Sequence, residues 1–375
     1  MRALIRNSKE KKVLNLSEYY LTKDNKMFYL PQINGNKTSI FIIIFMFIII
    51  IPTTTAIIML TTTTTNNPVY GQQDKTNFNT TDSLTIQSIP AKKVQVGDID
   101  IAYKMLGKGD PILLFNGATE GMDQWDQSFP RSLSSNHTVI AFDSRGLGNT
   151  TMGSKQYSMQ QLADDAAGLL DALKIPDADV MGYSLGSYIA QKFTIIYPDK
   201  VSSLTLVASS CGGKDNTPIP PEFLKLELEI ANKSLNNISI SQDEMKELVI
   251  ASEGSGWIKL HPEVLENIPT DMQQAKPGLS PEAMNNQTNV TMEWAAPNWS
   301  GACDELAKLD KPTLVIAGTD DNKLVPYVNS LKIVEKIPGA WLVQIKNAGH
   351  AVMDQYPEEM GKIINTFLST TAQTN

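Results

Sequence analysis

The sequence predicts an α/β fold with a mostly parallel central sheet, helices on its faces and a helical insertion between two strands. Short apolar runs alternate with amphipathic segments over residues 91–210 and again over 302–370. This alternation is typical of parallel strands joined by covering helices. Over residues 211–301 the alternation stops, and amphipathic patterns separated by Pro, Gly and Asn predict helices only.

The elements are expected in a regular order. Alternating polar and apolar residues around Gly97 and Asp98 predict a hairpin over residues 92–103. The chain is then expected to form strands at 112–115, 138–142, 180 and 204–208 and helices at 121–134, 158–173 and 184–197. Further helices are predicted at 221–232, 241–252 and 281–294 in the insertion, and strands at 313–317 and 341–345 after it.

The N-terminal part contains a long apolar segment. Ile40 to Ile51 is continuously apolar, and residues 39–60 are long enough to span the roughly 30 Å hydrocarbon core of a membrane. Residues 1–38 carry eight Lys or Arg against three acidic residues, and a basic flank of this kind stays in the cytoplasm. We therefore expect a transmembrane anchor at 39–60, with the chain after it outside the cell.

A cleaved signal peptide is the alternative, because the strictly apolar run of twelve residues also has the length of a signal-peptide core. A start at Met27 would give the basic flank a length that is usual for such a leader. In either case the folded part is exported, and N-terminal sequencing of the mature chain distinguishes an anchored from a secreted protein. Residues 61–90 are rich in Thr, Asn and Gln and are expected to form a disordered stalk, and residues 371–375 a tail.

Charge and cysteine content exclude several classes of function. The net charge is −8, and because residues 1–38 contribute +5, the remainder carries −13. An acidic exported domain has no electrostatic basis for binding nucleic acid. The sequence has no zinc-like Cys/His spacing, P-loop or dinucleotide fingerprint, so no metal and no cofactor are expected. Cys211 and Cys303 either pair at the base of the insertion or remain two buried thiols.

The most informative motif is Gly182-Tyr183-Ser184-Leu185-Gly186. An apolar strand ends just before it, and a helical pattern follows from Ser187 to Tyr197. In a strand-turn-helix of this type the serine projects from a tight turn, and the two glycines leave room for the neighbouring backbone. Ser184 is therefore the candidate nucleophile, at a helix N-terminus whose N–H groups favour negative charge.

The search for a general base is short, since the chain contains only three histidines. His350 closely follows the apolar run Trp341 to Ile345, and active groups are expected at such strand ends. His137 precedes a strand and is expected in a surface loop, and His261 precedes a proline in an irregular region. His350 is therefore the candidate base.

A carboxylate is needed to hold the imidazole in one tautomer and to stabilise its protonated form. Gly318-Thr319-Asp320-Asp321 directly follows the apolar run 313–317. The spacing from the glycine favours Asp321, and Asp320 remains a second candidate. The chain order Ser184, Asp321, His350 is the order nucleophile, acid, base that accompanies a serine at this kind of turn.

With these motifs, the chain from about Lys92 to about Leu368 resembles the α/β-hydrolase superfamily, in its branch with a helical lid. The segment Ile112 to Ala118 resembles the family's strand and oxyanion loop, with Asn116 in place of the usual histidine. The resemblance implies that the backbone N–H groups of Ala118 and Leu185 form the oxyanion hole and that residues 211–301 form the lid.

Two further features bear on this resemblance. Asp143 to Gly148 resembles the D-x-R-G-x-G turn of the family, and we interpret Asp143 and Arg145 as structural residues. The acid loop departs from the pattern, because Pro326 lies five positions after Asp321 rather than the usual four.

The expected reaction is a two-step acyl transfer. His350, oriented by Asp321, takes the proton of Ser184 as it attacks a carbonyl, and water then repeats the sequence on the acyl-enzyme. A serine at the turn argues against the haloalkane dehalogenase and epoxide hydrolase branches, which need a carboxylate there. We therefore expect a carboxylesterase-like serine hydrolase that cleaves esters of small or medium-sized apolar substrates.

Other functions of the same fold remain open. One is an aminopeptidase, with an acidic lid residue such as Glu227, Glu229 or Glu253 holding the substrate amine. The others are a lactonase, a C–C bond hydrolase, a haloperoxidase or perhydrolase, and a receptor that binds a ligand without turnover.

Overall fold

The computed structural model describes residues 2–4, 13–15, 19–21, 27–29, 84–235, 238–266, 268 and 280–371. The chain divides into two compact units, Met1–Ser39 and Ile40–Asn375. The first unit contains two short antiparallel strand pairs, β1 (Arg2–Leu4) with β2 (Val13–Asn15) and β3 (Tyr19–Leu21) with β4 (Met27–Tyr29).

The predicted membrane segment at 39–60 lies outside the described residues. Among the helices that the structure does describe, none combines the length and apolar character needed to cross a bilayer. Residues 61–83 of the predicted stalk and residues 372–375 of the predicted tail also fall outside the described part.

The last residues of the predicted stalk, 84–90, are attached to the core of the second unit through Ile86 and Ile89, so the prediction of disorder is wrong for them. Ile86 is fully buried and belongs to the same apolar cluster as Met122 and Trp125. The side-chain amide of Gln87 donates a hydrogen bond to the carbonyl of Trp125 at 2.7 Å. A single isoleucine among polar residues gives no periodic signal, which is why the sequence pattern does not reveal this contact.

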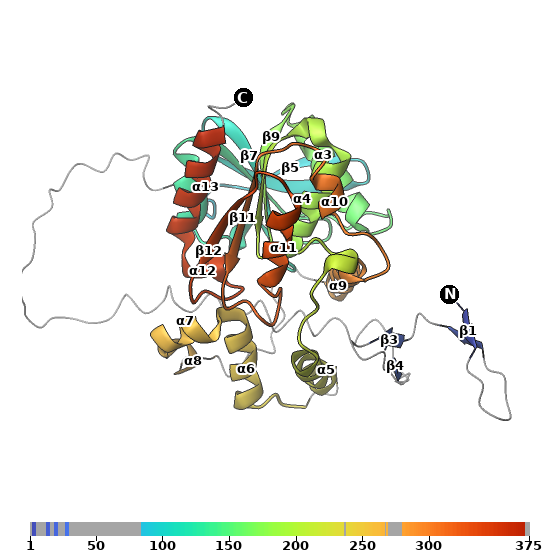
Figure 1. Cartoon of the computed structure of the whole chain (residues 1–375). Helices are drawn as coiled ribbons and strands as arrows, with labels where there is room; N and C mark the ends of the chain where they lie inside the picture. The colour runs from blue at the N-terminus through green and yellow to red at the C-terminus, as the bar shows by residue number, and fades with distance from the viewer. Residues whose placement is uncertain are drawn as a thin grey trace, which may run out of the picture. The chain divides into compact units, whose positions relative to one another are not determined.

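Eight strands among the described residues form one sheet in the second unit, and Figure 1 shows it surrounded by helices. The strand order is β12-β11-β10-β9-β7-β8-β6-β5. Every pair of neighbours in the part of the sheet ordered β12-β11-β10-β9-β7-β8 is parallel. Strand β6 is antiparallel to both of its neighbours, β8 and β5. This confirms the predicted, mostly parallel sheet. Its strands are β5 (Lys92–Val96), β6 (Ile99–Gly107), β7 (Asp110–Phe115), β8 (His137–Phe142), β9 (Ala178–Tyr183), β10 (Val201–Val207), β11 (Thr313–Gly318) and β12 (Trp341–Ile345).

Alternate side chains of each strand enter two apolar clusters, one on each face of the sheet. Leu113 and Phe115 of β7 join residues of helices α3 and α4 in one cluster. Ile112 and Leu114 join residues of helices α2 and α13 in the other, and Figure 1 shows α13 on the opposite side of the sheet from α3 and α4. Because both faces are covered, the central strands are continuous apolar runs in the sequence.

Capping side chains define where several helices begin. At the start of α3, the hydroxyl of Ser158 accepts a hydrogen bond from the N–H of Gln161 at 3.1 Å. Ser241 and Glu244 form a capping box at the start of α6. The helices are η4 (Met122–Gln124), α2 (Ser128–Ser134), α3 (Met159–Ala172), α4 (Leu185–Ile196), η5 (Pro198–Lys200), η6 (Gly213–Asp215), α5 (Pro221–Leu235), α6 (Gln242–Glu253), α7 (Ser255–Leu260), α8 (Glu263–Glu266), α9 (Pro281–Ala295), α10 (Cys303–Leu306), α11 (Val328–Lys336), α12 (Val352–Gln355) and α13 (Pro357–Thr371).

Two local predictions are wrong. The helix expected over 121–134 is split into η4 and α2, because Trp125 is extended and the carboxylate of Asp126 accepts the N–H of Ser128 at 2.8 Å. An aspartate of this kind offers the backbone a turn in place of a continuing helix. His137, expected in a surface loop, is the buried first residue of β8, where it pairs with Asp110 of β7.

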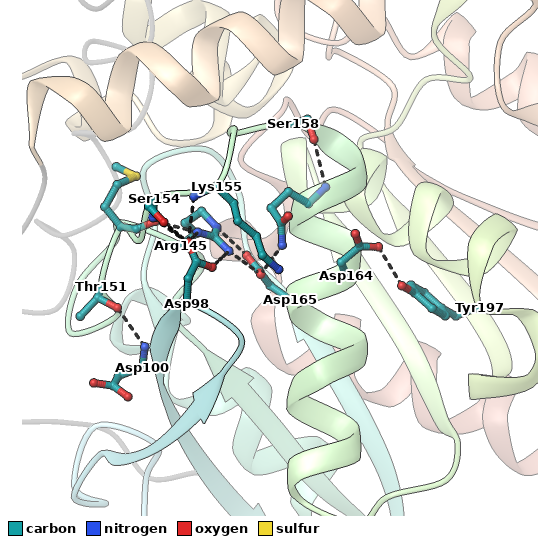
Figure 2. Close-up of polar contacts among 12 residues, drawn as sticks. Asp98, Asp100, Arg145, Thr151, Ser154, Lys155, Ser158, Asp164, Asp165 and Tyr197 are labelled. Atoms are coloured by element: carbon teal, nitrogen blue, oxygen red, sulfur yellow. Dashed lines mark hydrogen bonds and ion pairs between the residues drawn. The ribbon is translucent and has the colours of Figure 1, made fainter.

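Arg145 is fully buried, and Figure 2 shows its side chain bonded to Asp98 and Asp165, which come from two different segments. Its guanidinium donates two hydrogen bonds to Asp165 of α3, at 2.8 and 2.7 Å, and two to Asp98 of the β5–β6 turn, at 3.2 and 3.0 Å. Burial alone would lower the pKa of Arg145, but the two carboxylates outweigh it and raise this pKa. The hydrogen bonds from Arg145 lower the pKa of Asp98. The structural interpretation of Arg145 is consistent with these contacts.

The helices between β10 and β11 pack in two different ways. Residues of α5 and α6 form an apolar cluster of their own, which includes Phe223, Ile230 and Leu248. Helix α9 instead contributes Val290 and Trp294 to the cluster that also contains residues of α3 and α4. Helix α9 is therefore part of the main core, whereas α5 and α6 have a separate one.

A disulfide bond between Cys211 and Cys303 closes the base of this helical insertion. Cys211 lies shortly after β10 and Cys303 begins α10, and the N–H of Ala302 donates to the carbonyl of Cys211 at 2.8 Å. Of the two alternatives that the sequence left open, the structure has the paired one. The bond spans a sequence separation of 92 residues.

We expect the Cys211→Ala/Cys303→Ala double variant to lose about 4 kcal/mol of unfolding free energy, since a cross-link over a loop of this length restricts the unfolded chain strongly. Urea unfolding followed by circular dichroism measures the loss, and reduced wild-type protein should unfold at the same urea concentration as the double variant. Equal midpoints for oxidised wild type and the double variant would contradict a stabilising role.

Glu227 of α5 should make the free energy of unfolding depend on pH. Its side chain is buried, and this burial raises its pKa from 4.5 to about 8. The folded protein then holds a proton that the unfolded chain releases. Its contribution to stability is therefore complete below about pH 4.5 and is lost, by about 1.4 kcal/mol per pH unit, as the pH rises to about 8.

Glu227→Gln should remove this part of the pH dependence, because glutamine does not ionise. The measurement is the urea midpoint of wild type and variant at about pH 5 and about pH 8. Glu229→Gln, which changes a more exposed carboxylate of the same helix that pairs with Lys225 at 3.6 Å, is the control. An equal fall in wild type and Glu227→Gln between the two pH values would rule out Glu227 as its source.

Candidate active site

Ser184 occupies the turn between β9 and α4. Its backbone has φ 53° and ψ −123°, a left-handed conformation that is uncommon for a residue with a side chain. The N–H of Ser184 donates to the carbonyl of Val207 in β10 at 3.0 Å. The serine is therefore held at the carboxyl end of the strands, which is where the sequence placed it.

The two glycines of the motif are required by close backbone packing. A Cβ atom at Gly182 would lie 2.3 Å from the carbonyl oxygen of Gly186, and one at Gly186 would lie 2.2 Å from the carbonyl oxygen of Phe115. No side chain fits at such distances. Close backbone contacts on both sides of Ser184 thus require the Gly-x-Ser-x-Gly spacing.

His350 and Asp321 lie beside Ser184. The Nε2 atom of His350 is 2.9 Å from the Oγ atom of Ser184, and its Nδ1 atom is 2.7 Å from Oδ2 of Asp321. Both the imidazole and the carboxylate are buried. Because a carboxylate only accepts, Nδ1 carries the hydrogen in this pair and Nε2 is left to accept the hydroxyl proton of Ser184.

The loops around this pair are fixed by hydrogen bonds. The other carboxylate oxygen of Asp321 accepts the N–H of Val325 at 3.1 Å, and the hydroxyl of Tyr183 donates to the carbonyl of His350 at 3.1 Å. Burial raises the pKa of Tyr183 well above its usual range, so its hydroxyl keeps the proton that it donates.

Asp320, the second candidate for the acid, faces a different partner. Its Oδ2 atom accepts the N–H of Gly256 at 2.6 Å, next to the start of α7. Asp320 therefore connects the acid loop to the helical insertion, and Asp321 is the carboxylate that the structure brings to His350.

Three hydrogen bonds from backbone N–H groups hold the loop after β7. The N–H of Gly117 donates to the side chain of Asn116 at 2.8 Å, that of Thr119 to the side chain of Gln287 at 2.6 Å, and that of Glu120 to the carbonyl of Gly117 at 3.3 Å. Among the described residues, these bonds leave the N–H of Ala118 without a partner.

Leu185 supplies a second N–H group of this kind. It is the first residue of α4, and the first N–H groups of a helix have no acceptor within that helix. Ala118 and Leu185 are both buried and belong to the same apolar cluster. Their role as the donors of an oxyanion hole stays a prediction.

Asn116 anchors the oxyanion loop in place of the histidine usual in the family. Besides accepting from Gly117, its amide donates to the carbonyl of Gly121 at 3.0 Å. Asp143 fixes the far end, since its carboxylate accepts the N–H groups of Met122 and Asn149, both at 2.8 Å. Burial raises the pKa of Asp143 despite these two bonds. Both contacts support a structural role for Asp143.

A buried polar network lies behind Ser184 and was not predicted from the sequence. The hydroxyl of Ser187 donates to the carbonyl of Ser184 at 2.6 Å and hydrogen-bonds with the hydroxyl of Ser209 at 2.7 Å. The amide of Gln191 donates to Ser209 Oγ and to the carbonyl of Ser210, both at 3.0 Å. Ser187, Gln191 and Thr194 lie on one face of α4 among mostly apolar residues, and this polar spacing is the signal that could have indicated the network.

The other two histidines are not part of the site. His137 is buried at the start of β8, and His261 stacks on Trp257 with ring centroids 4.0 Å apart. His261 also lies 3.1 Å from the carboxylate of Glu263. Within the described residues, no group of His, Cys, Asp and Glu side chains is arranged to hold a metal ion.

Known proteins of several activities are similar to this chain. A putative carbamate hydrolase of Azorhizobium caulinodans is 28% identical over 271 residues, which are 72% of this chain and 96% of that protein. A putative non-heme bromoperoxidase of Mycobacterium tuberculosis is 26% identical over 72% of this chain and 98% of that protein.

A solved structure described as a thermophilic esterase from Thermogutta terrifontis superposes with a TM-score of 0.59. It is 26% identical and covers 76% of this chain and 99% of that one. The family model of the alpha/beta hydrolase fold matches residues 110–357, which is more than half of the chain and includes Ser184, Asp321 and His350. The chain therefore belongs to the α/β-hydrolase family.

Proposed function

We propose that this protein is a serine hydrolase that cleaves carboxylic esters of small or medium-sized apolar substrates through an acyl-enzyme on Ser184. The observation that carries the proposal is the hydrogen-bonded chain from Asp321 through His350 to Ser184. A hydroxyl at 2.9 Å from an acceptor nitrogen, with that ring oriented by a buried carboxylate, is the arrangement that activates a serine nucleophile.

The proposed reaction begins when Ser184 Oγ attacks the ester carbonyl carbon and His350 Nε2 takes the hydroxyl proton. The carbonyl oxygen becomes an oxyanion, which accepts hydrogen bonds from the N–H groups of Ala118 and Leu185. The protonated imidazole, stabilised by Asp321, gives its proton to the leaving alcohol. Water then attacks the acyl-enzyme by the same route, which releases the acid and restores the serine.

Three carboxyl groups of the insertion bear on the aminopeptidase alternative. Glu229 pairs with Lys225, and Glu253 accepts a hydrogen bond from the side-chain amide of Gln355 at 2.7 Å. Burial raises the pKa of Glu227 to about 8, so its neutral form is favoured at neutral pH. A substrate amine would need a carboxylate that is ionised and accessible, which excludes the buried, neutral Glu227 but not the exposed Glu229.

We also propose that the helical insertion acts as the lid of this site. Its α6–α7 junction contacts the loops on which the acid and the base lie. The carbonyl of Ser252 accepts the N–H of Ala351 at 3.0 Å, beside His350, and the N–H of Gly256 donates to Asp320. Membrane attachment and export stay predictions, and the disulfide bond is of the kind that persists in oxidising compartments.

Ser184→Ala tests the nucleophile. We expect the variant to lose labelling by a fluorophosphonate probe and to lower kcat for p-nitrophenyl acetate by about 10⁶-fold, because the attacking oxygen is absent. Ser135→Ala, which removes an exposed hydroxyl, should retain both activities. Probe labelling without any turnover of acyl esters of two to eight carbons would favour the ligand-binding receptor instead.

The neighbouring aspartates offer a matched comparison for the acid. Asp321→Asn should lower kcat by about 10⁴-fold, since an amide no longer fixes the required imidazole tautomer. Asp320→Asn keeps an acceptor for Gly256 and should cost far less activity. The measurement is the pH profile of kcat for both variants, and equal losses in the two would argue that the acid has been wrongly assigned.

A further inference from the structure

Gln287 connects the helical insertion to the oxyanion loop. It is a buried residue of α9, and its side-chain oxygen accepts the N–H of Thr119 at 2.6 Å. The two residues are 168 positions apart in the chain. Thr119 directly follows Ala118, whose N–H group is one of the two proposed oxyanion donors.

The backbone at Thr119 needs such a support. Its φ angle is 62°, in the left-handed region, which is strongly disfavoured for a β-branched residue. Strain of this kind persists only where surrounding contacts hold the backbone in place. Without Gln287, the N–H of Thr119 would also be buried without an acceptor, which adds a desolvation penalty. Both effects favour a rotated loop in which Ala118 N–H points elsewhere.

Helix α9 is itself fixed to the helix that follows the nucleophile. The ring of Trp294 stacks on Tyr188 of α4, with centroids 5.5 Å apart and an interplanar angle of 12°. The indole N–H of Trp294 donates to the carbonyl of Ser210 at 3.1 Å, the same carbonyl that Gln191 contacts. Gln287 and Leu185 are therefore held in one packed unit that includes α4 and α9.

We propose that Gln287 is a positioning residue that aims the N–H of Ala118 at the oxyanion by holding the N–H of the next residue. The inference rests on the proposed acyl transfer at Ser184 and deepens it, because it names what sets the second donor of the oxyanion hole. Loss of the Gln287 contact is expected to raise the energy of the transition state rather than that of the bound substrate. The substrate carbonyl gains most of its negative charge only after attack, so a misaimed donor lowers kcat more than it changes KM.

Gln287→Met tests the inference in the full-length chain, because methionine has a similar length and no oxygen to accept the Thr119 N–H. With p-nitrophenyl acetate we expect kcat to fall by about 10- to 100-fold and KM to stay within about twofold. Gln287→Glu retains an acceptor oxygen at the same reach and should recover most of the loss. Asn289→Met, which changes an exposed amide of the same helix, is the control and should resemble wild type.

The fluorophosphonate labelling rate at Ser184 provides a second readout, because phosphonylation also places negative charge on an oxygen in the hole. Failure of the wild-type chain to react with the probe or to hydrolyse the ester would sink the proposed hydrolase function. Normal wild-type reactivity combined with an unchanged kcat in Gln287→Met would overturn the inference alone.

Thermal unfolding of each variant distinguishes a loss of folding from a loss of positioning of the Ala118 N–H group. Gln287→Ala undergoes the same measurements as Gln287→Met, so that the better-folded of the two decides the outcome. A reduced kcat with an unchanged KM and a cooperative unfolding transition supports the inference. A kcat that falls only in proportion to the unfolded fraction contradicts it.

Discussion

The site depends on the close packing of backbone atoms around Ser184, with no side chains between them. Gly182 approaches the carbonyl of Gly186, and Gly186 approaches that of Phe115, at distances that exclude any Cβ atom. Strands β7 and β9 and helix α4 therefore meet without side chains between them. The same approach that forces Ser184 into a left-handed conformation brings the loop after β7 next to the first turn of α4. This proximity underlies the proposal that N–H groups of both segments hold the oxyanion.

The main features of the fold and the triad residues could be predicted because each depends on a local sequence pattern or on a residue type that is rare in this chain. Both faces of the sheet are covered, so its strands appear as apolar runs. Ser184, Asp321 and His350 each come shortly after the end of one of these strands. Only three histidines had to be considered. The choice between Asp320 and Asp321 rested on spacing from Gly318, and the structure brings Asp321 to His350.

Contacts between segments that are distant in the sequence could not be predicted in the same way. Nothing in the pattern around Gln287 indicates that its side chain accepts the N–H of Thr119, because both residues have ordinary neighbours and the bond depends on how α9 packs. The packing of Ile86 is a similar case, since one apolar residue in a polar stretch produces no periodicity. The cysteine pairing stayed open because spacing alone does not determine whether two thiols meet.

The α-carbons of Cys211 and Cys303 are only 5.3 Å apart, so the helical insertion leaves and re-enters the core at nearly one point. The strands on either side, β10 and β11, are already parallel neighbours and do not depend on the insertion to bring them together. A segment attached in this way is modular. This applies to α5 to α8, whose apolar cluster is separate from the main core. These helices can be lengthened, shortened or exchanged while the strand register stays the same, whereas α9 packs in the main core and holds Thr119 through Gln287. The selectivity of the proposed site can therefore change without any change in its triad.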